Sequence, residues 1–329
     1  MNGEEKNRGK LILDATCAPA DIRYPNDLGI LNQAREQTEK LIDKLYSCIK
    51  EKTKTKPRTY RKLARKDYLS VAKQRRSSKK QRRKAIKRQL QYIARNLVTI
   101  DKIVSEIGLK VLSRKQYRML LVITEVNRQQ LCMYENSENR IDDRIVSLTQ
   151  PHIRPIIRGK AGTPVEFGAK LSASCVNGYV FLDRISWDNF NESCDLKIQV
   201  ESFKNFTGTY PESVHVDKIY RTRENRAWCK EKGIRISGVP LGRPPKNISK
   251  STKKQAQLDE RVRSCIEGKF GEGKRRFSLN CVMAKLANTA ETTIAISFLA
   301  MNLSTLLRQL FVFFYVYLKF KYSVRVAIR

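Results

Sequence analysis

Alternation of apolar and polar positions in the second half of the chain predicts β-strands. In "VEFGAKLSASC" (165–175) the odd positions are apolar or small and the even positions are polar or glycine, which is the two-residue period of a half-buried strand. Asn177 and Gly178 follow, a pair favoured in two-residue hairpin turns, and "YVFLDRISW" (179–187) continues as a strand. We therefore expect a β-hairpin here.

The segments after this hairpin switch between helical and extended patterns. They predict a helix in 192–206, a short strand in "SVHVD" (213–217) and another strand in "IRIS" (234–237). Between the two short strands, "RTRENRAWCKEKG" predicts a further helix, for which Thr222 provides an N-cap and Gly233 an end.

The stretch "IEGKFGEGKR" (266–275) fits the phosphate-loop spacing G-x-x-x-x-G-K, except that Arg275 replaces the hydroxyl residue that would bind Mg²⁺. A phosphate loop should follow a buried strand and open a helix. The apolar residues before it instead recur at helical spacing, at Leu258, Val262 and Ile266. We therefore interpret the match to a nucleotide-binding loop as chance. A nucleotide hydrolase stays the third alternative, which predicts ATP binding that depends on Lys274 and which an absence of ATP binding would exclude.

That helical segment carries a row of charged residues. Glu260, Glu267 and Lys274 recur every seven residues, and Arg263 lies one turn before Glu267. The three glycines beyond Glu267 disfavour a helix there, since each costs about 1 kcal/mol relative to alanine. A solvated helix face with salt bridges is the simplest interpretation of such a row.

Two aspartates change that interpretation. Asp14 follows "KLIL", an apolar run typical of a strand buried on both faces, and Asp217 ends "SVHVD". Each could be a capping or loop residue, but α/β sheets place ligands at the carboxyl ends of such strands. With Glu267 they form a set of oxygen donors suited to Mg²⁺. Two such ions can flank a phosphodiester bond.

The charge of the chain points to a polyanionic partner. The chain has 66 Lys and Arg against 32 Asp and Glu, a net charge of +34, and residues 50–95 alone contain 20 basic residues and two acids. Nucleic acid is the simplest partner for such a surface, and an anionic membrane is the second. Apolar residues at helical spacing beneath the charges predict basic helices that rest on a core: Ile86, Leu90, Ile93 and Leu97.

Other chemistries are poorly supported by composition. The eight cysteines form no C-x-x-C pair and the chain has two histidines, which argues against a zinc site and a His-based triad. No secretory leader pattern opens the chain, so we expect a reducing cytosol as its setting.

Three segments carry a family resemblance: "LILDATCAPADIRYPNDLGILNQARE", "VHVDKIYRTRENRAWCKEKGIRISG" and "RVRSCIEGKFGEGKRRFSLNCVMAKL". Together they resemble insertion-sequence transposases of the DDE class, in the group related to the fourth and fifth named elements. The third resembles the signature of that group, in which Tyr, Arg, Glu and Lys are separated by two, three and six residues. Arg263, Glu267 and Lys274 match it, while Glu260 stands at the tyrosine position.

The resemblance implies an α/β fold: an RNase H-like mixed sheet flanked by helices, with a basic helical insertion after the first strand. It implies that Asp14, Asp217 and Glu267 are the catalytic metal ligands, with Mg²⁺ as the cofactor and Mn²⁺ as a substitute. Arg263 and Lys274 would bind DNA near the site. We also expect six residues of the insertion to contact phosphates: Arg75, Arg76, Lys79, Lys80, Arg82 and Arg83.

The resemblance also implies partners and a setting. The partners are double-stranded DNA, as transposon ends and target, and a second copy of the full-length chain. The protein would act in the cytoplasm of a prokaryote, at the nucleoid. The alternative is a catalytically inactive transposase remnant that binds DNA without specificity.

From these patterns we expect four parts: a residual linker at 1–9, a catalytic core at 10–49 and 151–311, a basic insertion at 50–150, and an apolar and basic tail at 312–329. Because the family normally has a sizeable domain before the first aspartate, we expect the chain to lack it. The apolar run "LFVFFYVYL" has nine residues, fewer than the roughly twenty that span a bilayer, so we expect no membrane anchor.

Overall fold

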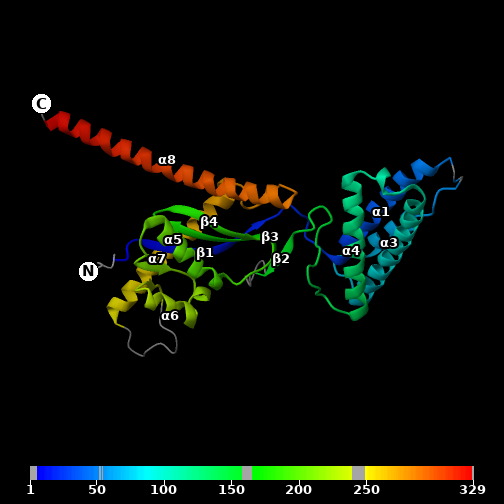
Figure 1. The fold of residues 1–329 in the computed structure, drawn as a ribbon, viewed down its shortest axis with the longest axis horizontal. Helices are drawn as coiled ribbons and strands as arrows, with labels where there is room; N and C mark the ends of the chain where they lie inside the picture. The colour runs from blue at the N-terminus through cyan, green and yellow to red at the C-terminus, as the bar shows by residue number, and fades with distance from the viewer. Residues whose placement is uncertain (1–5, 52, 54, 158–164, 239–248, 328–329) are drawn as a thin grey trace. The chain divides into compact units, whose positions relative to one another are not determined.

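The computed structural model forms two compact units, drawn in Figure 1. The core unit consists of Met1–Asp21 and Pro155–Arg329, and the helical unit of Ile22–Arg154. The structure describes every residue except 1–5, 52, 54, 158–164, 239–248 and 328–329, and side chains up to residue 317. The domain boundaries expected from the sequence stay predictions.

The core unit is built on a mixed sheet. Its described strands are β1 (Lys10–Pro19), β2 (Arg154–Ile157), β3 (Val165–Val176), β4 (Tyr179–Ser186), β5 (Ser213–His215) and β6 (Arg235–Ile236). They lie in the order β2-β3-β1-β5-β6, with β4 paired to β3. β1 runs antiparallel to β3 and parallel to β5, so the unit has a mixed α/β fold in which the first strand is central, as predicted.

The strands follow the sequence patterns closely. β3 and β4 form the predicted hairpin, and the turn residues Asn177 and Gly178 have φ of 52° and 84°, the left-handed values that this turn requires. The short strands predicted in 213–217 and 234–237 are confirmed as β5 and β6. Thr222 caps the helix that follows β5, since its side chain accepts a hydrogen bond from the backbone N–H of Asn225.

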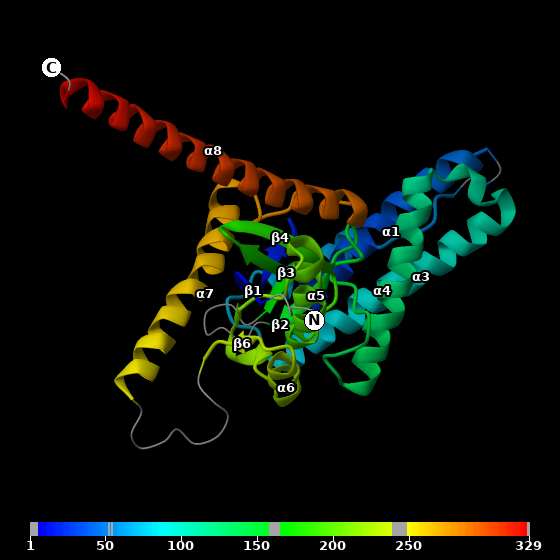
Figure 2. The same cartoon turned by 60° about the vertical axis from the view of Figure 1, so that its left-hand side comes forward.

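Helices cover both faces of this sheet. These helices are α5 (Leu196–Thr207), α6 (Arg223–Glu231), α7 (Lys250–Arg276) and α8 (Ala287–Ala327). Leu11 and Leu13 of β1 belong to the core formed with α5 and α6, whereas Ile12 belongs to the core formed with α7 and α8. Since side chains alternate along a strand, Asp14 lies on the Ile12 side, which α7 covers. Residues of both α7 and α8 belong to this second core, and Figure 2 shows the end of α7 next to α8.

The apolar run before Asp14 suggested that this residue stands at the end of a strand. In the structure it lies within β1. β1 continues to Pro19 because its antiparallel pairing with β3 extends that far. Its parallel pairing with β5, by contrast, ends at the pair Ile12 and His215. Asp14 is therefore the second residue beyond the last pair with β5, where one edge of β1 no longer has a strand beside it.

The glycines of α7 do not end this helix, contrary to the sequence expectation. The helix continues past Glu267 to Arg276. Gly273 is buried, and a Cβ built there would lie 2.7 Å from Leu279 Cδ1 and 2.8 Å from Met301 Sδ. Close packing against these two core residues thus compensates for the poor helix propensity of glycine at this position.

The helical unit contains α1 (Asp27–Ile49), α2 (Arg61–Ala72), α3 (Lys79–Ile107) and α4 (Arg114–Asn136). The predicted apolar row of the basic segment lies on α3, where Leu90 and Ile93 are buried and Ile86 and Leu97 pack against them. Ser78 forms a capping box with Gln81 at the start of α3, which explains why the helix begins in so basic a stretch. Three short 3₁₀ helices complete the described elements: η1 (Leu109–Val111), η2 (Glu192–Cys194) and η3 (Lys218–Tyr220).

The last helix is apolar well beyond the part that packs on the sheet. One face of α8 joins the core through Ala290, Ile294, Phe298 and Met301, whereas the apolar residues from Leu310 to Tyr317 are exposed. Among the described residues, α8 alone is long and apolar enough to cross a membrane over Ala287–Tyr317. Part of that span is the core helix just described, so its length and composition are weak evidence for a membrane.

Candidate active site

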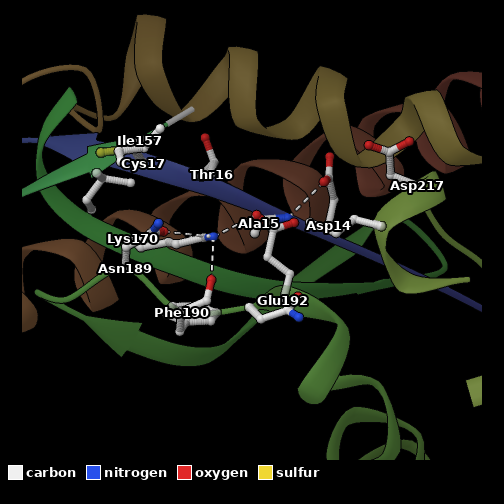
Figure 3. A pocket seen from close by; sticks show the side chains of 13 residues that line it. Asp14, Ala15, Thr16, Cys17, Ile157, Lys170, Asn189, Phe190, Glu192 and Asp217 are labelled. Atoms are coloured by element: carbon white, nitrogen blue, oxygen red, sulfur yellow. Dashed lines mark hydrogen bonds and ion pairs between the residues drawn. The ribbon is translucent and has the colours of Figure 1, made fainter. Parts of the chain in front are cut away.

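Asp14 and Asp217 line one pocket of about 590 Å³ in the core unit, shown in Figure 3. Residues 14–17 of β1 form one wall, next to the point where β5 ends. Lys170 of β3 and the loop residues 189–192 form another wall. The topology of the sheet thus brings together two aspartates that are far apart in the chain.

Asp14 is partly buried, and its Oδ1 accepts a hydrogen bond from the backbone N–H of Ala15 at 2.8 Å. Burial raises the pKa of Asp14 to about 6, and the negative charges of Glu192 and Glu267 add to this rise, while the Ala15 hydrogen bond and the charge of Arg263 oppose it. Burial is therefore the main cause of the raised pKa, and the charges of neighbouring acids and of Arg263 act in opposite directions.

Asp217 follows β5 by two residues and is exposed. Its Oδ1 accepts a hydrogen bond from the backbone N–H of Lys218 at 2.6 Å, so the side chain caps η3. This cap fixes the carboxylate at the rim of the pocket. The capping interpretation and the site interpretation of Asp217 are therefore compatible.

Glu267 lies on α7 and is absent from the pocket lining. Its carboxylate accepts a hydrogen bond from Arg263 Nη1 at 2.9 Å, and the same guanidinium donates to Glu260 at 2.6 and 3.0 Å. These hydrogen bonds raise the pKa of Arg263, and the hydrogen bond with Glu260 has the larger effect. Because Glu267 also affects the pKa of Asp14, it lies within electrostatic range of the pocket.

A buried carboxylate anchors α7 to the sheet. Asp259 is 5% exposed and accepts hydrogen bonds from Arg235 of β6 at 2.8 and 2.9 Å. On the same helix, Ile266 and Phe270 pack in the core under the sheet. This anchoring explains why residues Glu260, Arg263 and Glu267 are held at a defined position beside β1.

Among the described residues, no group of three His, Cys, Asp or Glu side chains is placed to hold a metal ion. The two pocket aspartates nevertheless fit a divalent cation such as Mg²⁺, which is often bound by one or two carboxylates together with water and substrate phosphates. The roles of Asp14, Asp217 and Glu267 as metal ligands stay predictions.

The predicted DNA-binding residues differ in how accessible they are. Arg263 has a side chain only 15% exposed, and Lys274 is partly buried. Five residues of the helical unit are exposed: Arg75, Arg76, Lys79, Lys80 and Arg82. Arg83 instead packs against α4, since it lies over the Tyr134 ring at 4.1 Å and donates to the Tyr134 carbonyl at 2.9 Å.

The sequence reasoning missed two charged residues of the pocket, Lys170 and Glu192. Lys170 occupies one of the polar positions of the β3 alternation, which suggested a solvated face. In the structure Ser172 is buried beneath α5, from which Gln199 donates a 3.2 Å hydrogen bond to it, and Lys170 is buried against the loop that follows β4. The alternation does not distinguish a strand face covered by other elements from a solvated face, so it gave no signal for Lys170 or for its partner Glu192.

Comparison with known proteins gave one result. Residues 214–304 match a family model described as "Transposase DDE domain". No curated protein and no solved structure matches the chain. The matched segment includes Asp217, Arg263, Glu267 and Lys274 and leaves Asp14 outside. Such domains act on DNA and generally use divalent metals, and the match shows that this segment is similar to a DDE transposase domain.

Proposed function

We propose that the chain is the catalytic core of an insertion-sequence transposase, which cuts DNA at the ends of the element and joins the free 3′ ends to target DNA. Asp14, Asp217 and Glu267 are its catalytic acids. The observation that carries the proposal is the common pocket of Asp14 and Asp217, of which only Asp217 lies in the matched segment.

We further propose that the core unit is an RNase H-like fold. Its order of elements supports this: a central strand with Asp14, an antiparallel hairpin, α5, a parallel strand before Asp217, α6, and a later helix with Glu267. On this interpretation the helical unit contains the basic insertion that the sequence predicts at 50–150.

The cofactor of the proposed reaction is Mg²⁺, with Mn²⁺ as a substitute, because all three proposed ligands are carboxylates. When bound, the ions supply activation of the attacking water or 3′-hydroxyl and stabilisation of the leaving oxygen. Asp14 and Asp217 would hold them in the pocket, and Glu267 would contribute from α7.

The residues of the chain prepare this site electrostatically. The Arg263 guanidinium forms ion pairs with Glu267 and Glu260. Its positive charge also acts on Asp14, so it reduces the repulsion between Asp14 and any further negative charge nearby. The backbone N–H groups of Ala15 and Lys218 fix one oxygen of each pocket aspartate. The other oxygen of each aspartate is then oriented before any ligand binds, which reduces the cost of ordering the site.

DNA is the proposed substrate, and the exposed basic residues of α3 and the segment before it are the proposed contacts to its phosphates. We also propose that two full-length copies act together on the two ends of an element, at the prokaryotic nucleoid. The net charge of +34 supports a strongly salt-dependent affinity for DNA.

Nicking of supercoiled plasmid in the presence of Mg²⁺ or Mn²⁺ tests this proposal. We expect Asp14→Asn and Asp217→Asn each to lower the nicking rate at least about 100-fold, which corresponds to roughly 2.7 kcal/mol of transition-state stabilisation. Glu231→Gln is the matched control, since it removes an acid that is 68% exposed on α6, outside the pocket. If the unmodified protein binds DNA but does not nick it, the non-catalytic remnant is the better description.

A further inference from the structure

Lys170 is an unusually buried lysine in the wall of the pocket. It lies on β3, opposite Cys17 of β1, and is 9% exposed. Lysine is seldom buried without partners, since an unpaired ammonium group is strongly destabilised away from water. Its contacts should therefore indicate what its burial achieves.

The Lys170 ammonium group has its two hydrogen-bond acceptors and its ion-pair partner in one segment of the chain. The group donates to the Phe190 carbonyl at 2.7 Å and to Asn189 Oδ1 at 3.3 Å, and it lies 2.9 Å from Glu192 Oε1. The Phe190 ring also lies 4.8 Å from the ammonium group and 4.1 Å from the Arg184 guanidinium. Lys170 thus ties the segment from Asn189 to Glu192 to the sheet.

This segment is part of the pocket that contains the catalytic aspartates. Asn189, Phe190 and Glu192 line it together with Asp14 and Asp217, and Figure 3 shows the Lys170 contacts on the wall that they form. The side chain of Glu192 is 18% exposed, so its charge is poorly screened by water. Consistent with this position, Glu192 is the first among the neighbouring charges that affect the pKa of Asp14.

We propose that Lys170 is a positioning residue that fixes Glu192 in the pocket wall, and that Glu192 is a fourth acid which strengthens the binding of divalent cations beside Asp14. This inference rests on the proposed function. The inference adds Lys170 and Glu192 to the proposed site, and both residues lie before the matched segment, which begins at residue 214. Because the buried Lys170 ammonium group is already held by two hydrogen bonds and by the Glu192 carboxylate, its proposed role is to act through Glu192 and the loop and not to bind phosphate itself.

The experiment measures Mn²⁺ binding by electron paramagnetic resonance, which needs neither DNA nor turnover. Glu192→Gln removes the charge and keeps an oxygen at the position that lies beside the Lys170 ammonium group. Lys170→Met/Glu192→Gln removes both charges, so no buried charge is left unpaired. We expect the dissociation constant for Mn²⁺ to rise about tenfold or more in both variants, as is typical when residues that orient metal ligands are replaced.

The matched control is Lys197→Met/Glu224→Gln, an ion pair of the same unit whose two residues lie outside the pocket. It should leave Mn²⁺ binding unchanged. Far-ultraviolet circular dichroism and thermal melting establish that each variant is folded. If the double replacement at Lys170 and Glu192 prevents folding, Glu192→Gln alone decides, because it leaves both hydrogen bonds of Lys170 in place.

Asp14→Asn distinguishes a failure of this inference from a failure of the proposed metal site. Loss of Mn²⁺ binding in Asp14→Asn, with binding of unmodified strength in folded Glu192→Gln, overturns this inference and leaves the proposed function in place. Equal Mn²⁺ binding by Asp14→Asn and the unmodified protein overturns the proposed metal site, and this inference with it.

Discussion

Arg263 and Glu267 are joined across one helical turn by a hydrogen bond of 2.9 Å, and the same guanidinium holds Glu260 at 2.6 Å. Glu260 and Glu267 therefore have the same partner and similar exposure, with side chains 59% and 52% exposed. Only Glu267 is a proposed metal ligand, although both are carboxylates on the same helix. The pair provides an internal comparison for the role of Glu267.

We predict that Glu267→Gln lowers metal-dependent plasmid nicking at least about 100-fold, whereas Glu260→Gln lowers it less than about fivefold. Both variants should melt within a few degrees of the unmodified protein, because an exposed ion pair contributes about 0–1 kcal/mol. Single-turnover nicking rates at saturating Mn²⁺ provide the measurement. Equal losses in the two variants would contradict the assignment of Glu267.

We predict that Asp14→Asn stabilises the protein at pH 7 in the presence of EDTA. Folding raises the pKa of Asp14 from 3.8 to about 6, so the folded state binds this proton more tightly than the unfolded state does. The unmodified protein therefore loses stability relative to Asp14→Asn as the pH rises from about 4 to 6, by up to about 3 kcal/mol. Urea unfolding at pH 4, 5, 6 and 7 measures this difference.

The control for this pH series is Asp142→Asn, which removes an exposed carboxyl in the helical unit. Its effect on the free energy of unfolding should be within about 0.5 kcal/mol throughout. A stability difference for Asp14→Asn that does not grow with pH would show that burial does not destabilise the Asp14 carboxylate.

Two glycines of α7 should respond to alanine in opposite directions. A Cβ at Gly268 has no atom within 4 Å, so Gly268→Ala should stabilise the helix by about 0.5–1 kcal/mol. A Cβ at Gly273 would lie 2.7 Å from Leu279 and 2.8 Å from Met301, which are both fully buried and have little room to move. Gly273→Ala should therefore destabilise by about 1–3 kcal/mol.

Chemical denaturation of both variants in the same buffer provides this measurement, and each variant is the control for the other. If Gly273→Ala were as stable as Gly268→Ala, the packing of α7 against α8 would be looser than the structure has it.

Neutralising the start of α3 should weaken DNA binding in a salt-dependent way. The triple variant Lys79→Gln/Lys80→Gln/Arg82→Gln removes three exposed charges. If each contacts a phosphate, the slope of log affinity against log salt becomes shallower by about 2.7, since each phosphate contributes about 0.9. Fluorescence anisotropy of a labelled duplex at several salt concentrations measures this slope.

The matched control removes the same charge from the start of α4, as Arg114→Gln/Lys115→Gln/Arg118→Gln, where all three side chains are also exposed. It should change the slope by less than about one. Equal changes in the two triple variants would show that net charge, and not the predicted residues, determines DNA binding.

Local patterns predicted the elements well because their causes are local. The hairpin at Asn177 and Gly178 depends on a turn that few residue pairs adopt, and the alternation of β3 reflects a sheet face covered by α7 and α8. The helical spacing before Ile266 likewise excluded a phosphate loop, and α7 confirms the helix.

The errors came from contacts between distant parts of the chain. Pairing with β3 extends β1 past Asp14, and packing against Leu279 and Met301 keeps α7 helical at Gly273. Lys170 was overlooked for the same reason, because its burial depends on the loop that follows β4 and not on its neighbours in β3. The candidate site depends both on local patterns and on contacts between distant segments. Sequence spacing indicated its acids, and the topology of the sheet brought Asp14 and Asp217 to one pocket.

The interruption of the core unit by the helical unit has a consequence for biosynthesis. The register of the sheet pairs Ile12 with Cys175, so β1 emerges from the ribosome long before its antiparallel neighbour exists. The helical unit is continuous from Ile22 to Arg154 and can form in the interval, which shortens the chain that must be closed to join the two strands. Nascent β1 must therefore wait for its antiparallel neighbour until β3 has been translated, after the whole helical unit.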